Sequence, residues 1–140
     1  MLQGSIVALV TPMHADGSID WEAHERLVRW HVESGTAGVV PMGTTGESAT
    51  LNTREHLEVI SRTIEVANGG ISVVAGTGSN STEETLHQTK EAESLGADAC
   101  LLVTPYYNRP TQEGLYAHFK KVAETTSVPL VLYNVPGRTG

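Results

Sequence analysis

Five short apolar runs, spaced about 30 residues apart, constrain the fold of this chain more than any other feature. The runs occupy residues 5–10, 38–42, 71–76, 99–103 and 130–134, and none of them contains a charged residue. Strands that are covered on both faces have this composition, as they do in parallel sheets. A spacing of about 30 residues is the length of one strand–loop–helix unit. The pattern therefore predicts a parallel sheet with a helix after each strand.

The segments between the runs carry helix start signals. Candidate N-cap residues stand at the head of four segments: Asp20, Asn52, Ser81 and Thr111. Asn52 and Ser81 are each followed three residues later by a glutamate, which predicts a capping box at both positions. In the first helix, the spacing predicts a buried face made of Ala23, Leu27 and Trp30. The sequence thus predicts four β–α units followed by a fifth strand.

Two α/β architectures use this alternation, a doubly wound open sheet and a (β/α)8 barrel. A doubly wound domain of five strands needs a helix to cover its last strand, but only six residues follow Asn134. We therefore expect an α/β fold of the TIM (β/α)8 barrel type, reduced to about the first four βα units plus strand five. Residues 1–140 are expected to be the N-terminal part of a single barrel domain, inactive alone and prone to associate through open strand edges.

Composition excludes several classes of function. The net charge is −7, and an acidic chain of this kind repels nucleic acid and anionic membranes. No apolar run approaches the roughly 20 residues of a membrane-spanning helix. The single cysteine, Cys100, lies in an apolar run where a thiol usually packs, and the six histidines form no metal-binding pair or HExxH motif. We expect a cytoplasmic protein with no metal and no cofactor.

Functional side chains of parallel α/β folds gather in the loops that follow the strands. Glycines flank Thr44 and Thr45 in one such loop, and the turn can either present N–H groups to a small carboxylate or serve as a plain tight turn. The residues 76–78 begin like a dinucleotide-binding motif, but Ser81 stands where its third glycine belongs, which favours an ordinary turn.

Tyrosines and one arginine complete the set of strand-end residues. Tyr106, Tyr107 and Tyr133 either pack or relay protons, since a phenol can exchange protons with a hydroxyl bound to it. Arg138 either binds a carboxylate through its planar fork or remains a solvated surface charge.

Four motifs resemble the dihydrodipicolinate synthase/N-acetylneuraminate lyase superfamily along the whole chain. They are GSIVALVTPM at residues 4–13, GTTGE at 43–47, TPYYNRP at 104–110 and YNVPGRTG at 133–140. The double tyrosine followed by NRP and the GRTG ending resemble the synthase branch. The resemblance implies a barrel enzyme that condenses pyruvate with aspartate 4-semialdehyde in lysine and diaminopimelate synthesis. In that family a lysine forms an imine with pyruvate, and the derived enamine attacks the aldehyde.

The resemblance also implies roles for individual residues. Thr44, Tyr133 and Tyr107 are expected to form a hydroxyl relay, with Tyr133 as the principal acid and base. Tyr107 is expected to come from a neighbouring subunit of a homodimer or homotetramer. Thr45 is expected to bind the pyruvate carboxylate, and Arg138 the carboxylate of the semialdehyde.

Many bacterial members of the family bind lysine as an inhibitor at a subunit interface. The residues that match this effector site are Ser48, Ala49, His56, Asn80, Glu84 and Tyr106. Thr53 stands where some members have histidine, and Glu84 also has a structural reading as the partner of the Ser81 cap.

No lysine of this chain suits imine formation. Lys90, Lys120 and Lys121 all lie in predicted helices, away from the strand ends, where a solvated amine stays protonated. The imine-forming lysine is therefore expected outside this sequence. Three other functions remain open: a 2-keto-sugar-acid or N-acetylneuraminate aldolase, a non-catalytic module that binds carboxylates or lysine, and a flavodoxin-like nucleotide binder.

Overall fold

A computed structural model describes residues 2–140 of the chain, which form alternating strands and helices. The strands are β1 (Ile6–Ala8), β2 (Gly38–Val40), β3 (Ser72–Gly76), β4 (Ala99–Val103) and β5 (Leu130–Tyr133). The helices are α1 (Trp21–Glu33), α2 (Thr53–Ala67), α3 (Thr82–Leu95), α4 (Gln112–Ala123) and the short α5 (Pro136–Thr139), and a 3-10 turn, η1, spans Thr44–Gly46. All five predicted strands are present, and several are one to three residues shorter than predicted.

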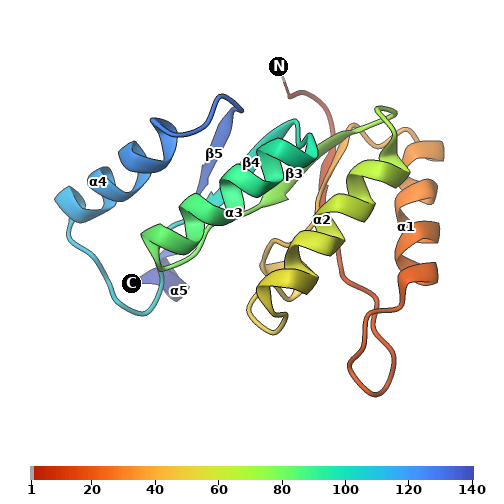
Figure 1. The fold of residues 1–140 in the computed structure, drawn as a ribbon, viewed down its shortest axis with the longest axis horizontal. Coiled ribbons are helices and arrows are strands. Elements are labelled where there is room, and N and C mark those ends of the chain that lie inside the picture. Colours follow the sequence, from red (N-terminus) through yellow and green to blue (C-terminus); the bar gives the residue numbers. More distant parts are fainter. Residues whose placement is uncertain (1) are drawn as a thin grey trace.

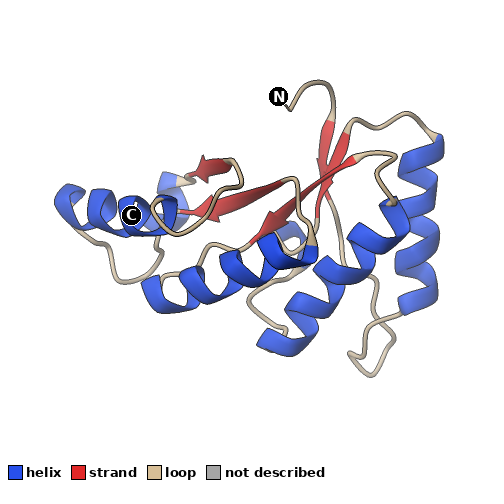
Figure 2. Cartoon of the chain, turned by 45° about the horizontal axis from the view of Figure 1, so that its top comes forward, coloured by secondary structure: helices blue, strands red, loops and turns tan. Residues whose placement is uncertain are grey.

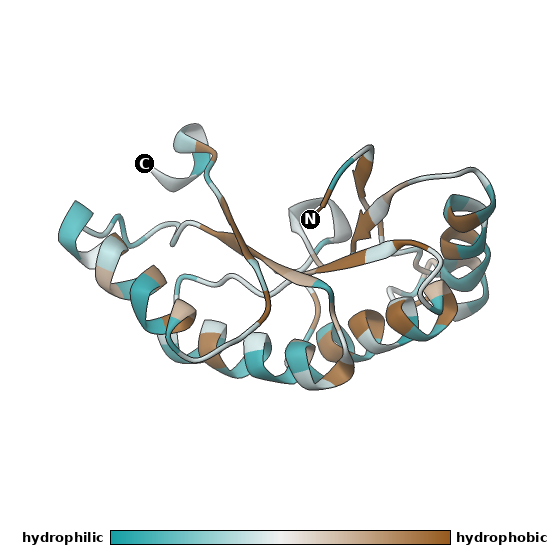
Figure 3. Cartoon of the chain, turned by 90° about the horizontal axis from the view of Figure 1, so that it is seen from above, coloured by the Kyte–Doolittle hydropathy of each residue, from teal (hydrophilic) through white to brown (hydrophobic). Residues whose placement is uncertain are grey.

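The five strands form one parallel sheet in the order β1-β2-β3-β4-β5. Helices α1 to α4 all lie along the same, convex face of this sheet, and the opposite face is open (Figures 1, 2 and 3). A doubly wound domain reverses its strand order and carries helices on both faces. The sequential order and the single helical layer therefore confirm the predicted barrel type and exclude the flavodoxin-like alternative.

All four predicted N-caps are present, but one of the two predicted capping boxes is incomplete. The side chains of Asp20, Asn52, Ser81 and Thr111 each accept a hydrogen bond from the backbone N–H three residues later. At α2 the box is complete, since Glu55 also accepts from the N–H of Asn52 at 3.2 Å. At α3 the predicted box is wrong in its second half. Glu84 there accepts instead from the Ser79 hydroxyl at 2.5 Å, which ties it to the preceding loop.

The predicted inner face of α1 is confirmed at Leu27, which packs against the core, and is wrong at Trp30. Trp30 is 57% exposed, whereas His24, Val28 and His31 are the buried residues of the helix. The histidines are accommodated by hydroxyls: His24 Nε2 lies 3.0 Å from Thr63 Oγ1, and His31 Nδ1 lies 3.0 Å from Thr36 Oγ1. Each bond gives one ring nitrogen a partner, whereas the buried His24 Nδ1 has none within the described residues. Polar residues therefore occupy a face that an apolar pattern does not reveal.

Side chains of the strands alternate between the helical layer and the open face. Val39 and Val73 pack in the core beneath the helices, while their neighbours Val40 and Val74 form a second cluster with Ala99 on the opposite side. In β5, paired in register with β4, the same alternation puts Tyr133 on the open face, across from Val103. Apolar residues follow the strands in Figure 3. The open face is therefore where strand-end side chains meet.

Three buried histidines make the stability of this fold dependent on pH. Burial lowers the pKa values of His24, His56 and His118 below 6.5, with Arg62 lowering that of His24 further. Below pH 6.5 these histidines bind protons in the unfolded chain but not in the folded chain. Their neutral forms therefore contribute fully to stability above this pH, and the free energy of unfolding falls as the pH falls below it. We expect the free energy of unfolding to decrease between pH 7.5 and 5.5, by up to about 1.4 kcal/mol per pH unit for each histidine.

Urea denaturation of the chain at several pH values measures this slope. His24→Gln should reduce the slope, while His87→Gln, which removes an exposed histidine from α3, should leave it as in the parent. A slope that is the same in the parent and in His24→Gln would show that His24 is not held neutral by burial.

Candidate active site

The loop after β2 is folded tightly against the end of β1. It contains the turn η1, and the residues on both sides of it, Met42 and Glu47, each have a φ of +59°. Gly46 is needed at the closest approach, because a Cβ there would lie 3.0 Å from the carbonyl oxygen of Leu9. The buried hydroxyl of Thr11 donates to the Gly46 carbonyl at 2.7 Å. These contacts fix the backbone from which Thr44 and Thr45 project.

The turn leaves two backbone donors available. The N–H groups of Gly46 and Glu47 donate to the carbonyls of Gly43 and Thr44 inside the turn. Within residues 2–140, the N–H groups of Thr44 and Thr45 have no hydrogen-bond partner, and both residues are exposed. The predicted convergence of N–H groups is therefore limited to these two, supplemented by the two threonine hydroxyls.

Tyr133 is placed by the register of the sheet. It pairs with Val103, and its carbonyl accepts the N–H of Thr104 at 2.8 Å. Arg138 follows on α5, a short helix held by two bonds of the buried Thr139. The Thr139 hydroxyl lies 2.6 Å from Asn134 Oδ1 and 3.2 Å from the Val135 carbonyl. The chain thus turns back after β5 and brings the arginine over the end of the sheet.

These loops enclose adjoining cavities at the C-terminal end of the sheet. Thr44, Tyr133 and Arg138 line one cavity of about 240 Å³ and also a second, more open one of about 410 Å³. Thr45 lines the second cavity. Two hydroxyl side chains, one phenol and one guanidinium therefore share one space, although they come from two loops that are distant in sequence.

Three of the six candidate effector residues also line the smaller cavity, namely Ser48, Ala49 and Tyr106. Asn80 lies beside them and donates to the Tyr106 carbonyl at 3.3 Å. Tyr107 has a different place: its side chain is 91% exposed, and it lines neither cavity. Within this one chain, Tyr107 is therefore separate from Thr44 and Tyr133.

The other two effector candidates are engaged in internal hydrogen bonds. The buried His56 ring bonds through Nε2 to the carbonyl of Gly76 at 2.7 Å. Burial lowers the pKa of His56, against the opposing influence of that carbonyl and of Glu84. Glu84 accepts from Ser79 and from Gln88 Nε2. Both residues support the loop after β3 rather than line a cavity.

The three lysines lie on the helices, as predicted. Lys90 belongs to α3, and Lys120 and Lys121 belong to α4, where Lys120 pairs with Glu124. None of them lines either cavity at the strand ends. Cys100 is fully buried in β4, and burial raises the pKa of its thiol to about 11, so it is held as an unreactive thiol.

Sequence reasoning passed over four residues of the smaller cavity: Gly78, Val103, Val135 and Thr139. Gly78 is required there by close packing, because a Cβ would lie 2.2 Å from the backbone nitrogen of Val103. Val103 and Val135 are apolar strand-end residues without a chemical signal. Thr139 lies in the GRTG motif, and its position in that motif is the signal that could have identified it.

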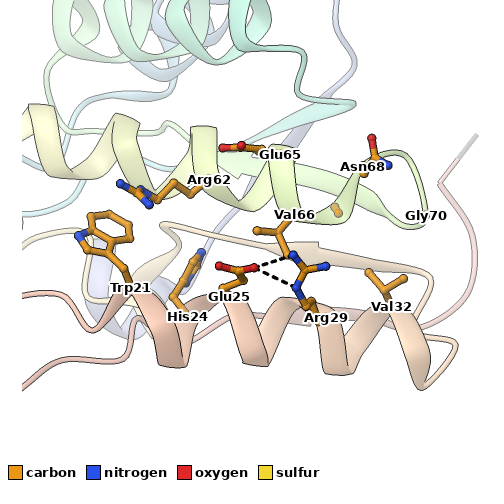
Figure 4. Close-up of a pocket in the computed structure, with 11 residues that line it drawn as sticks. Trp21, His24, Glu25, Arg29, Val32, Arg62, Glu65, Val66, Asn68 and Gly70 are labelled. Atoms are coloured by element: carbon orange, nitrogen blue, oxygen red, sulfur yellow. Dashed lines mark hydrogen bonds and ion pairs between the residues drawn. The ribbon is translucent and has the colours of Figure 1, made fainter.

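A larger cavity, of about 550 Å³, lies on the helical layer between α1 and α2 (Figure 4). Three of its charged side chains are already engaged. Arg29 bonds to Glu25, and the guanidinium of Arg62 lies 4.4 Å from the ring centre of Trp21. Its lining residues belong to α1, to α2 and to the residues just after α2, and none lies at a C-terminal strand end. We therefore assign the chemistry to the cavities at the C-terminal end of the sheet.

Two general searches complete the description of residues 2–140. No three His, Cys, Asp or Glu side chains there are grouped closely enough to hold a metal ion. None of the described helices is long and apolar enough to cross a membrane.

Comparisons with known proteins place the chain in one family. The chain matches the dihydrodipicolinate synthetase family over residues 1–140. It is 60% identical to a 4-hydroxy-tetrahydrodipicolinate synthase of Cellvibrio japonicus over 140 residues, and 63% identical to one of Ruthia magnifica over 138 residues. These matches cover 100% and 99% of this chain but 48% and 47% of the relatives, so the chain spans about half their length.

Solved structures give the same result. The chloride-inhibited dihydrodipicolinate synthase of Acinetobacter baumannii, complexed with pyruvate, superposes with a TM-score of 0.98 at 61% identity. The dihydrodipicolinate synthase of Aquifex aeolicus superposes with a TM-score of 0.95 at 51% identity. The matches cover 100% and 98% of this chain and 48% and 46% of those chains. The family match, the sequence identities and the superposed folds agree: this chain belongs to the dihydrodipicolinate synthetase family.

Proposed function

We propose that residues 1–140 supply half of the active site of a Schiff-base synthase that condenses pyruvate with aspartate 4-semialdehyde to 4-hydroxy-tetrahydrodipicolinate. The observation that supports this most directly is the shared cavity of Thr44, Tyr133 and Arg138, with Thr45 at its edge. In this proposal the residues form the N-terminal part of one barrel domain, and the imine-forming lysine comes from a part of the barrel that this sequence does not include.

The chemistry follows from the groups in the cavity. An imine withdraws electrons from pyruvate, so that its methyl group loses a proton and the resulting enamine attacks the aldehyde. Thr45 and the free backbone donors of the loop would hold the pyruvate carboxylate. Tyr133 would move protons to and from the reacting atoms, with the hydroxyl of Thr44 as its relay. Arg138 would bind the second carboxylate, that of the semialdehyde, through its planar fork.

The second carboxylate favours the synthase over the sugar-acid aldolases of the superfamily. An aldehyde with a long polyol chain needs hydrogen-bonding contacts along that chain, whereas a short acidic aldehyde needs one cation. In the cavity, Arg138 lies with the apolar Val103 and Val135, which suit a short substrate better than a polyol.

Subunit contacts and regulation form the remaining part of the proposal. The exposed Tyr107 would complete the relay of a neighbouring subunit in a homodimer or homotetramer. Lysine would inhibit by binding near Ser48, Ala49 and Tyr106, with Asn80, Glu84 and His56 behind them. The shared lining of the smaller cavity supports this arrangement, because it brings effector and catalytic candidates into contact with one space.

A hybrid enzyme tests the proposed function. In this hybrid, residues 1–140 replace the matching segment of the Cellvibrio japonicus synthase, to which they are 60% identical. We expect the hybrid to consume pyruvate and aspartate 4-semialdehyde, to be inhibited by lysine, and to be inactive with N-acetylneuraminate. Incubation with pyruvate and borohydride should add one pyruvyl group to it, as measured by mass spectrometry.

The 140-residue chain is the matched control. Treated in the same way, it should gain no stoichiometric pyruvyl group, because its lysines lie on α3 and α4. A folded hybrid that lacks synthase activity while the parent Cellvibrio japonicus enzyme is active would refute the proposal. An adduct on Lys90, Lys120 or Lys121 would refute the placement of the imine outside this sequence.

A further inference from the structure

The loop between β4 and α4 holds Tyr107 in a backbone conformation that tyrosine rarely adopts. Its φ is +71°, in the left-handed region. The N–H of Asn108 donates to the carbonyl of Tyr106 at 2.9 Å, so one hydrogen bond spans Tyr107 from the residue before it to the residue after it. A three-residue turn with a positive central φ is the rare and strained form of the γ-turn. Such a conformation persists only where surrounding contacts hold it.

Two asparagines provide those contacts. The Asn108 side chain donates to the backbone carbonyl of Asn80 at 3.3 Å, and the Asn80 side chain donates to the backbone carbonyl of Tyr106 at 3.3 Å. We call this reciprocal pair the asparagine clamp. It joins the loop after β3 to the loop after β4 on both sides of Tyr107. The Tyr106 carbonyl therefore receives one bond from within its turn and one from the neighbouring loop.

The β3 side of the clamp is firmly anchored. Ser79, the residue before Asn80, is buried, and its backbone N–H donates to Thr85 Oγ1 at 3.0 Å. Its hydroxyl donates to Glu84 and accepts from the N–H of Ser81. Both Glu84 and Thr85 belong to the first turn of α3. The clamp therefore connects the exposed loop after β4 to the firmly held first turn of α3.

Because the Tyr107 side chain is so exposed, its backbone conformation determines the direction in which the side chain points. A side chain that is 91% exposed has almost no packing contacts with its own chain to orient it. Its direction is therefore set by the turn and by whatever holds the turn. We propose that Asn108 is a positioning residue, which acts through Tyr107 by holding its backbone in the turn that projects the phenol away from its own subunit. This inference rests on the proposed role of Tyr107 in the proton relay.

Kinetics of the hybrid enzyme test the clamp. Asn108→Ala should lower kcat about ten-fold, because the phenol is then less often in position, and should leave KM for pyruvate unchanged, because pyruvate contacts the loop after β2. The double variant Asn108→Ala/Tyr107→Phe should have the kcat of Tyr107→Phe alone. A residue that acts only through Tyr107 has no further effect once the phenol hydroxyl is gone.

Three further arms make the result decisive. Asn108→Asp keeps the shape but cannot donate, and it should behave as Asn108→Ala. Gln112→Ala removes an exposed amide from the first turn of α4 and should keep the parent kcat. Amide exchange of residues 104–110, measured by mass spectrometry, should be faster in Asn108→Ala whether or not the hybrid is active.

The outcomes are separable. An inactive hybrid with faster exchange in Asn108→Ala would refute the proposed function and leave the clamp supported. A kcat unchanged by Asn108→Ala, or losses that multiply in the double variant, would overturn the positioning role.

Discussion

Replacing Tyr133 by phenylalanine in the hybrid enzyme is expected to lower kcat by about a hundred-fold to ten-thousand-fold, the range for loss of a general acid–base group. Tyr133 lines both cavities at the strand ends and is fixed there by its pairing with Val103. The substitution keeps the ring and removes only the hydroxyl. Folding and KM for pyruvate should therefore change little, because Thr45, not Tyr133, is assigned to the carboxylate.

Tyr116→Phe is the matched control for this prediction. Tyr116 lies on α4 and is 68% exposed, so loss of its hydroxyl should leave kcat as in the parent. Steady-state rates at saturating substrate compare the two variants directly. If Tyr133→Phe retained more than about a third of the parent kcat, the phenol would not be the acid–base group of the relay.

Gly76→Ala is expected to destabilise the hybrid by roughly 3 kcal/mol, the upper part of the range for overpacking a filled core. A Cβ on Gly76 would lie 2.2 Å from the carbonyl oxygen of Met42 and 2.7 Å from the nitrogen of Gly43. Backbone atoms cannot rotate away as a side chain can. The strand end must therefore separate from the loop that leads to Thr44, and synthase activity should fall together with stability.

Gly114→Ala in α4 supplies the comparison. A Cβ there meets Pro110 at 3.4 Å and Thr111 Oγ1 at 3.5 Å, which are ordinary contacts. Since alanine favours a helix over glycine, stability should change by less than about 1 kcal/mol, toward a gain. Urea denaturation of both variants measures the difference. Equal stability of Gly76→Ala and the parent would show that the end of β3 and the loop after β2 approach less closely than the structure has them.

Local features of the fold were predictable from sequence. The N-caps of α1 to α4 depend on a residue and the N–H groups just after it, so Asp20, Asn52, Ser81 and Thr111 could be identified without the rest of the chain. The strands were found because uncharged β-branched runs are typical of parallel sheets. In this chain the helices cover only one face of that sheet (Figure 3). Their ends were less certain, since the last pair of hydrogen bonds depends on the neighbouring strand.

Features that depend on distant partners were not predictable. Trp30 was assigned to the inner face of α1 by its spacing from Ala23 and Leu27, but His24 and His31 are buried in this helix instead. Hydroxyls of Thr63 and Thr36 each bond to one of their ring nitrogens. Glu84 was assigned to the Ser81 cap, but Ser79 takes its carboxylate. In both cases a hydroxyl outside the local pattern decided the outcome.

The sequence by itself determined the order and approximate positions of the strands and helices, the capping residues, and the motifs that resemble the family to which the chain belongs. Only the tertiary structure decided that Thr44, Tyr133 and Arg138 line one cavity and that two asparagines hold the Tyr107 turn. The physical reason is the distance along the chain over which each interaction acts. Caps and strand propensities act within a few residues, whereas a cavity and a loop-to-loop clamp exist only when the curvature and register of the sheet bring separate strand ends together.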